Sequence, residues 1–210
     1  MNLKLPKKAL SYSAINLWYK DKRAYRRKYY EGIYPPETKY TIFGRQAEEE
    51  VYAGKLPGVP FFGGKQKKLV TEIAGVPIIA YLDSFDEETK QIIDYKSGIL
   101  KKDGAPRWTK VDVHNLKQLP FYSLLVERIY GNAHPEALLV WLETELRKPD
   151  TLLSQGEKVA LTGKFQIFKR RIAKWEREQM VEWTRKAAKE ISWDYEKWLA
   201  GIEDPPRYGV

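Results

Sequence analysis

The sequence predicts one α/β domain in which a central mixed β-sheet is flanked by helices. Helix-forming patterns occupy residues 11–53 and 172–199, whereas strand patterns concentrate in a central section at about 67–168. The composition agrees, because 210 residues with 43% hydrophobic side chains can bury one core without a second domain. The sequence contains no internal repeat and no low-complexity linker, so we expect the single domain to span residues 1–210.

The N-terminal section contains two helix patterns followed by a loop. Residues 11–30 combine an apolar face with a strongly basic one, and Ser11 or Ser13 can cap the first turn. A shorter helix is expected at about 43–53. Residues 54–64 hold four glycines and two prolines, which is typical of a loop.

Strand patterns alternate with loops and helices in the rest of the chain. Residues 97–111 are rich in glycine and lysine and predict a loop, and 112–130 predicts a helix that Pro120 either kinks or begins. The tryptophans of the C-terminal helix, at 172–199, lie at helical spacings, so most of them are expected in the core. Strands are predicted at 69–73, 76–85, 90–96, 136–145 and 157–168.

The charge balance indicates an anionic partner. Lysine and arginine number 37 against 28 acidic residues, which gives a net charge of +9. Nucleic acid is the first expectation and an anionic membrane surface the second. A solvated basic surface without a specific partner remains the alternative.

The composition excludes several classes of site. Without cysteine there is no disulfide, no thiolate zinc site, no iron–sulfur cluster and no cysteine nucleophile. Two histidines, His114 and His134, cannot form a three-histidine centre, so any metal must be held mainly by oxygen atoms. No phosphate-binding G-x-x-x-x-G-K-[ST] motif occurs, and we expect no nucleotide cofactor. No apolar run approaches about 20 residues and residues 1–10 lack a signal-peptide pattern, so we expect a cytoplasmic protein that does not enter membranes.

The hairpin at 76–96 carries two carboxylates and a lysine beside buried apolar runs. Asp94 and Lys96 alternate along one strand and therefore share a face. A two-residue turn at Glu87 and Glu88 would place Asp83 opposite Ile92, on that same face and diagonal to Asp94, at about 7–8 Å between Cα atoms. Two carboxylates so placed can bind one Mg²⁺ or Mn²⁺ ion, and the lysine can stabilise charge on a phosphate. The alternative is a solvated hairpin with alternating charges.

Four segments in order resemble the RecB-like branch of the PD-(D/E)xK nuclease superfamily. This branch includes the phage-type alkaline exonucleases and the CRISPR-associated adaptation nucleases. The core segment is 93–98 (IDYKSG), preceded by Asp83. The others are 10–13 (LSYS), 43–48 (FGRQAE) and 118–122 (QLPFY), which resemble the branch's S-x-S helix, its glycine-to-histidine or glutamate segment and its Q-x-x-x-Y motif.

The resemblance implies a restriction-endonuclease-like fold and a residue set for metal-dependent cleavage. Glu48, Asp83, Asp94 and the main-chain carbonyl of Tyr95 would bind one or two Mg²⁺ or Mn²⁺ ions, and Lys96 would be the catalytic lysine. Gln118 and Tyr122 would complete the catalytic set by approaching the core or the nucleic-acid backbone. The sequence departs from the family at Glu48, where many relatives have histidine, at Asp94, which is commonly glutamate, and at Pro120. The branch's four-cysteine cluster is absent.

Basic and aromatic side chains outside the core motif are expected to contact DNA. Among them, Trp108 lies in a polar loop close in sequence to Lys96 and could stack on an unpaired base. The full predicted set is Ser11, Ser13, Arg23, Arg27, Lys101, Lys102, Arg107 and Trp108.

These observations favour a metal-dependent deoxyribonuclease, and among such enzymes an exonuclease acting from DNA ends in recombination, repair or phage DNA metabolism. Two alternatives stay open: a structure-specific endonuclease or junction resolvase, and a nucleic-acid-binding protein that does not cleave. The expected partners are linear DNA ends, single- or double-stranded, and a recombinase, annealing protein or helicase; a homo-oligomer is compatible with the sequence. We expect the protein in a bacterial, archaeal or phage-infected cell.

Overall fold

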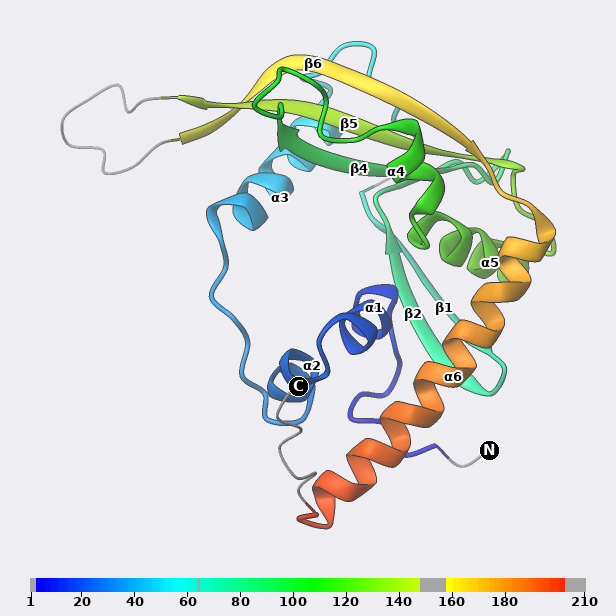
Figure 1. Ribbon diagram of the computed structural model, residues 1–210. Helices are drawn as coiled ribbons and strands as arrows, with labels where there is room; N and C mark the ends of the chain where they lie inside the picture. Colours follow the sequence, from blue (N-terminus) through cyan, green and yellow to red (C-terminus); the bar gives the residue numbers. More distant parts are fainter. Residues whose placement is uncertain (1–2, 64, 148–157, 203–210) are drawn as a thin grey trace. The chain divides into compact units, whose positions relative to one another are not determined.

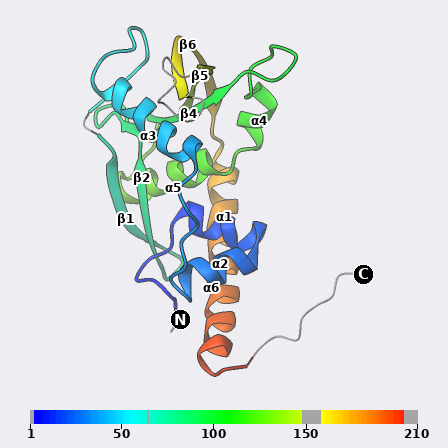
Figure 2. The ribbon, with the colours of Figure 1, turned by 90° about the vertical axis from the view of Figure 1, so that its left-hand side faces the viewer.

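The computed structural model describes residues 3–63, 65–147 and 158–202, and its central sheet is mixed (Figure 1). The strands β3 (Ser84–Phe85), β4 (Ile92–Ile99), β5 (Glu136–Arg147) and β6 (Lys158–Arg171) lie in the order β3-β4-β5-β6. β4 and β5 are parallel, and the other two pairings are antiparallel. Figures 1 and 2 both show β4, β5 and β6 side by side. The predicted α/β class with a mixed sheet and flanking helices is therefore confirmed.

The chain divides into two compact units, and each is described by itself. The sheet unit comprises residues 36–69 and 81–177, and the helical unit comprises 1–35, 70–80 and 178–210. A second sheet pairs β1 (Lys67–Ile73) with β2 (Val76–Leu82).

Within the sheet unit, helix α3 (Lys39–Tyr52) covers one face of the central sheet. Phe43, Ala47 and Val51 follow one another at intervals of four residues and pack against Ile93 and Val140. Thr38 begins the helix by accepting a hydrogen bond from the Thr41 amide at 3.2 Å. The helix therefore starts earlier than the predicted residue 43.

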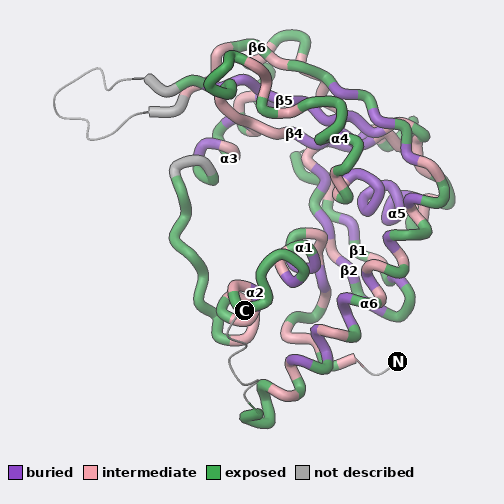
Figure 3. Tube along the Cα trace, in the orientation of Figure 1, coloured by how far each residue is buried: buried purple, intermediate pink, exposed green. Residues whose placement is uncertain are grey.

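The predicted helix at 112–130 is two helices, α4 (Lys110–Asn115) and α5 (Gln118–Tyr130). Pro120 lies in the first turn of α5. Backbone N–H groups in the first turn of a helix have no carbonyl partner within the helix, so a proline there costs no hydrogen bond. Residues 119–126 are all buried, and much of α5 carries the buried colour in Figure 3. Gly131 ends α5 with a left-handed φ of 80°.

The predicted helix at 11–30 is also divided, into α1 (Tyr12–Lys20) and α2 (Lys22–Tyr29) of the helical unit. Asp21 is extended, with φ −157°, and its carboxylate caps α2 by accepting from the Ala24 amide at 2.9 Å. Of the two predicted alternatives, Ser11 and Ser13, it is Ser11 that caps α1, since its hydroxyl accepts from the Ala14 amide at 3.2 Å.

The last helix, α6 (Lys174–Leu199), matches the predicted C-terminal helix, but the prediction that most of its tryptophans are buried is wrong. Trp175, Trp193 and Trp198 are 57%, 59% and 41% exposed. Small residues such as Ala187 and Ala188 fill the buried face instead, and both are fully buried. None of the described helices is long and apolar enough to cross a bilayer.

Candidate active site

The predicted strand 76–85 is interrupted at Asp83, and the turn after it differs from the prediction. The chain reverses through Glu87–Lys90, four residues rather than two, because Asp86 and Gln91 form the last backbone pair at 3.0 Å. The Asp86 carboxylate holds this turn through the amides of Glu88 and Thr89. The turn prediction was therefore wrong.

The longer turn shifts the register by two residues and so leaves the side-chain faces unchanged. Ser84 pairs with Ile93 and Phe85 with Ile92. Asp83, one residue before Ser84, consequently lies next to Asp94 rather than opposite Ile92.

Two hydrogen bonds fix Asp83 at the break between β2 and β3. Its carboxylate Oδ2 accepts from the Tyr95 main-chain amide at 2.9 Å, and its carbonyl accepts from the Tyr52 hydroxyl at 3.0 Å. Tyr52 lies on α3 one turn after Glu48, so both residues lie on the same face of the helix. Glu48 is a candidate metal ligand, and Tyr52 holds the main chain of Asp83, another candidate ligand.

Asp94 is 1% exposed and lies against Lys96 on the same strand. The Lys96 ammonium is 2.6 Å from Asp94 Oδ2, which confirms that the two side chains share a face. Neither carboxylate oxygen of Asp94 has a hydrogen bond of satisfactory geometry among the described residues. A buried carboxylate with such incomplete compensation is costly unless a cation binds it.

The acids of this cluster are close enough to shift one another's protonation. Burial, and then the negative charge of Asp94, raise the pKa of Asp83 to about 8. Burial also raises the pKa of Glu48. The negative charge of Asp94 raises this pKa further, whereas the positive charge of Lys96 lowers it. Burial lowers the pKa of Lys96, but Asp94, Asp83 and Glu48 outweigh it, so the net shift is upward. The structure thus brings Glu48, Asp83, Asp94 and Lys96 together.

A cavity of about 240 Å³ opens beside this cluster, between α3 and β4. Gly44, Ala47 and Glu48 line it from α3, and Tyr95 and Lys96 line it from β4. Within the described ranges, no three carboxylate or imidazole side chains already surround one point. An ion bound here would therefore need rotated side chains, main-chain carbonyls or water to complete its ligands. The oxygen donors and the incompletely compensated Asp94 fit a hard divalent cation such as Mg²⁺ or Mn²⁺.

Two solved structures resemble the chain over most of its length. One is a candidate exonuclease from Eubacterium rectale, with a TM-score of 0.58 and 12% identity, covering 96% of this chain and 85% of that one. The other is a phage-related exonuclease from Haemophilus somnus, with a TM-score of 0.57 and 15% identity, covering 91% and 83%. The chain shares their fold. No protein-family model and no curated protein sequence matches it.

The exonuclease-like fold also contains the predicted Gln118–Tyr122 pair. Both residues lie on α5, which contacts β4, and the Gln118 amide nitrogen donates to the Tyr122 hydroxyl at 2.9 Å. The spacing of four residues thus places the pair on one helix face, as predicted. Their participation in the catalytic set stays a prediction.

The predicted DNA contacts fall in both units. In the sheet unit, Lys101, Lys102 and Arg107 are exposed and Trp108 is half-buried. The other four belong to the helical unit: Arg23 and Arg27 are exposed, and the Ser13 hydroxyl lies 3.0 Å from that of Ser11.

Sequence reasoning missed Tyr52, although its spacing of four from Glu48 was a usable signal. We expect Tyr52→Phe to weaken metal affinity or activity by about 10–100-fold, because the lost hydroxyl frees the Asp83 main chain. The metal concentration that gives half-maximal cleavage should rise. Tyr81→Phe, at a tyrosine 48% exposed on β2, is the control. Equal metal dependence in both variants would contradict this role.

In chelator, the protein should lose stability as the pH rises from about 4 to about 8. Folded Asp83 keeps its proton up to a pKa of about 8, whereas an unfolded aspartic acid releases it near 3.8. Between these values the folded state binds more protons, so the free energy of unfolding falls as the pH rises, by at most about 1 kcal/mol per pH unit. Urea unfolding across this range should show a shallower slope for Asp83→Asn. An identical slope would refute the assignment.

Proposed function

We propose that the chain is a divalent-metal-dependent deoxyribonuclease of the RecB-like PD-(D/E)xK branch that hydrolyses phosphodiester bonds from DNA ends. The observation that carries the proposal is the buried Asp94 carboxylate, paired with Lys96 and adjacent to Asp83 and Glu48. The fold shared with two proteins named as exonucleases supports it. The net charge of +9 supports a polyanionic substrate.

Each residue of the cluster has a role in this mechanism. Asp94, Asp83 and Glu48 would hold Mg²⁺ or Mn²⁺, which when bound lowers the pKa of a water molecule and neutralises phosphate charge. Lys96 orients the attacking water or stabilises the negative charge that develops on the phosphate oxygens. Tyr52 and the Tyr95 amide keep Asp83 in place during these steps.

End-labelled linear DNA, single- and double-stranded, should be degraded with Mg²⁺ or Mn²⁺ and left intact with chelator. A covalently closed circle should survive, because an exonuclease needs an end. Asp94→Asn should abolish degradation, whereas Glu88→Gln, at an exposed acid on the same hairpin, should not. Cutting of the circle would support an endonuclease instead. Binding without cleavage under any divalent ion would support a non-cleaving DNA-binding protein.

A further inference from the structure

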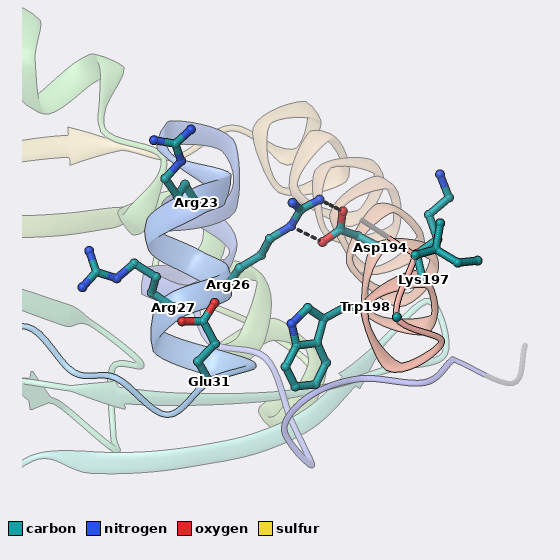
Figure 4. Close-up of a pocket in the computed structure, with 9 residues that line it drawn as sticks. Arg23, Arg26, Arg27, Glu31, Asp194, Lys197 and Trp198 are labelled. Atoms are coloured by element: carbon teal, nitrogen blue, oxygen red, sulfur yellow. Dashed lines mark hydrogen bonds and ion pairs between the residues drawn. The ribbon is translucent and has the colours of Figure 1, made fainter. Parts of the chain in front are cut away.

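A second cavity lies within the helical unit, between α2 and the end of α6. It measures about 440 Å³, which is within the range of small-molecule sites. Figure 4 shows Arg26 of α2 reaching across to Asp194 of α6, with the Trp198 ring beside this pair. Arg26 Nε donates to Asp194 Oδ2 at 2.8 Å, and a second guanidinium nitrogen contacts Oδ1. The ion pair therefore joins the two walls of the cavity.

Helix α2 carries five cations in eight residues, and most of them have partners. Lys22 pairs with Glu190 at 3.5 Å, Arg26 pairs with Asp194, and Lys28 lies over two tyrosine rings. The side chains of Arg23 and Arg27, one turn apart, have no ion pair or hydrogen bond within the described part of the chain, and both residues line the cavity. Two uncompensated guanidinium groups on one helix face favour an anionic ligand.

Trp198 supplies an aromatic surface in the same cavity. It is 41% exposed, although its helical spacing predicted burial. One neighbour, Tyr195, is stacked on it with an interplanar angle of 13° and a centroid distance of 5.8 Å, and Tyr30 packs at 5.5 Å. These contacts hold the indole in place while leaving part of it open to solvent, as a platform for stacking requires.

The lining selects among anionic ligands. Besides the arginines it includes Glu31, an exposed carboxylate that disfavours a small isolated dianion such as inorganic phosphate. A ligand with a flat apolar part for Trp198, a singly charged phosphodiester for the arginines and a hydrogen-bond donor for Glu31 fits better. Nucleotides of an unpaired strand have all three features.

We propose that this cavity binds a nucleotide of single-stranded DNA, with the base stacked on Trp198 and the backbone phosphate held by Arg23 and Arg27. The proposal deepens the proposed function and rests on it for the choice of DNA. It extends the predicted contacts at Arg23 and Arg27 to a defined site with an aromatic platform.

Binding is measured by fluorescence anisotropy with a labelled oligothymidine of about ten nucleotides, in chelator, where no metal-dependent cleavage occurs. Trp198→Ala should weaken binding by about 5- to 150-fold, and Trp198→Phe by less, since base stacking contributes about 1–3 kcal/mol. The matched control is Trp193→Ala, at a tryptophan 59% exposed on the same helix and outside the cavity, which should bind as the unmodified protein does.

The arginines are tested against an equal loss of charge elsewhere. Arg23→Ser with Arg27→Ser should weaken binding more than Lys186→Ser with Lys189→Ser, two exposed lysines of α6 outside the cavity. Thymidine monophosphate is tested as a free nucleotide, and it should bind far more weakly than the single-stranded oligothymidine. Circular dichroism melts establish that each variant is folded.

Three results would overturn the site: equal binding by the Trp198→Ala and Trp193→Ala variants, equal losses in the two double variants, or equal affinity for the strand and the monophosphate. Cleavage of linear DNA with Mg²⁺ is scored separately. A protein that binds through Trp198 but never cleaves refutes the nuclease and leaves this site standing. A protein that cleaves linear DNA but binds the strand equally well without Trp198 supports the nuclease and refutes this site.

Discussion

Replacement of Lys96 by alanine should lower the cleavage rate by about 10²- to 10³-fold while Mn²⁺ binding persists. The ammonium stabilises charge that appears only during the reaction, and loss of one such donor has effects of this size. The substitution removes none of the carboxylates that are proposed to bind the cation. Asp94 loses its only ion-pair partner among the described residues, and a bound cation can take that place. Single-turnover cleavage of linear DNA with saturating metal measures the effect.

The matched control for Lys96 is Lys68→Ala, at an exposed lysine on β1 of the same unit. This variant should cleave at nearly the unmodified rate, because it loses the same charge away from the carboxylates. Undiminished cleavage by Lys96→Ala would remove the lysine from the mechanism. Loss of both cleavage and Mn²⁺ binding would assign it a structural role instead.

Replacement of Glu176 by alanine should destabilise the protein by about 3–5 kcal/mol, the largest effect on stability that we expect. Arg170 on β6 and Glu176 on α6 are each 7% exposed and lie 2.7 Å apart. The arginine also donates to the carbonyls of Val113 and Leu116, so it joins the end of β6 to α4 and to the start of α6. Without Glu176 its charge stays buried and loses its carboxylate partner.

Urea unfolding tests this through the midpoint and through a double-mutant cycle. Glu176→Gln keeps a hydrogen-bond acceptor and should lose less stability than Glu176→Ala. The variant that combines Arg170→Met with Glu176→Leu should lose less stability than the sum of its two single variants, since neither charge is left buried without its partner. Additive losses in the double variant would contradict the coupling.

The sequence predicted the sheet and most of its strands because their hydrophobic patterns, alternating or continuous, correspond to the burial of these strands in the structure. Ile92 and Ile93 precede Asp94 on a strand buried on both faces. The shared face of Asp94 and Lys96 follows from strand geometry alone, so this prediction was robust. The turn was not, because Asp86 holds a four-residue loop through side-chain bonds that a count of residues does not reveal.

Helix ends were predicted less well, since caps decide them. Asp21 could have continued one helix as well as capped a second, and only its hydrogen bond to Ala24 separates the two outcomes. The exposure of Trp198 was missed because helical spacing states which residues share a face but not whether another element covers that face. The hydroxyl of Tyr52 reaches a residue 31 positions away, a contact that depends on the fold.

Direct measurement of Mn²⁺ binding in the absence of DNA tests the central claim most directly. Titration followed by electron paramagnetic resonance should show Mn²⁺ bound to the unmodified protein and little or none bound to Asp94→Asn, with Glu88→Gln binding as the unmodified protein does. Circular dichroism melts establish that each variant is folded. Equal Mn²⁺ binding by the folded Asp94→Asn variant and the unmodified protein would contradict the assignment of Glu48, Asp83 and Asp94 as the metal site.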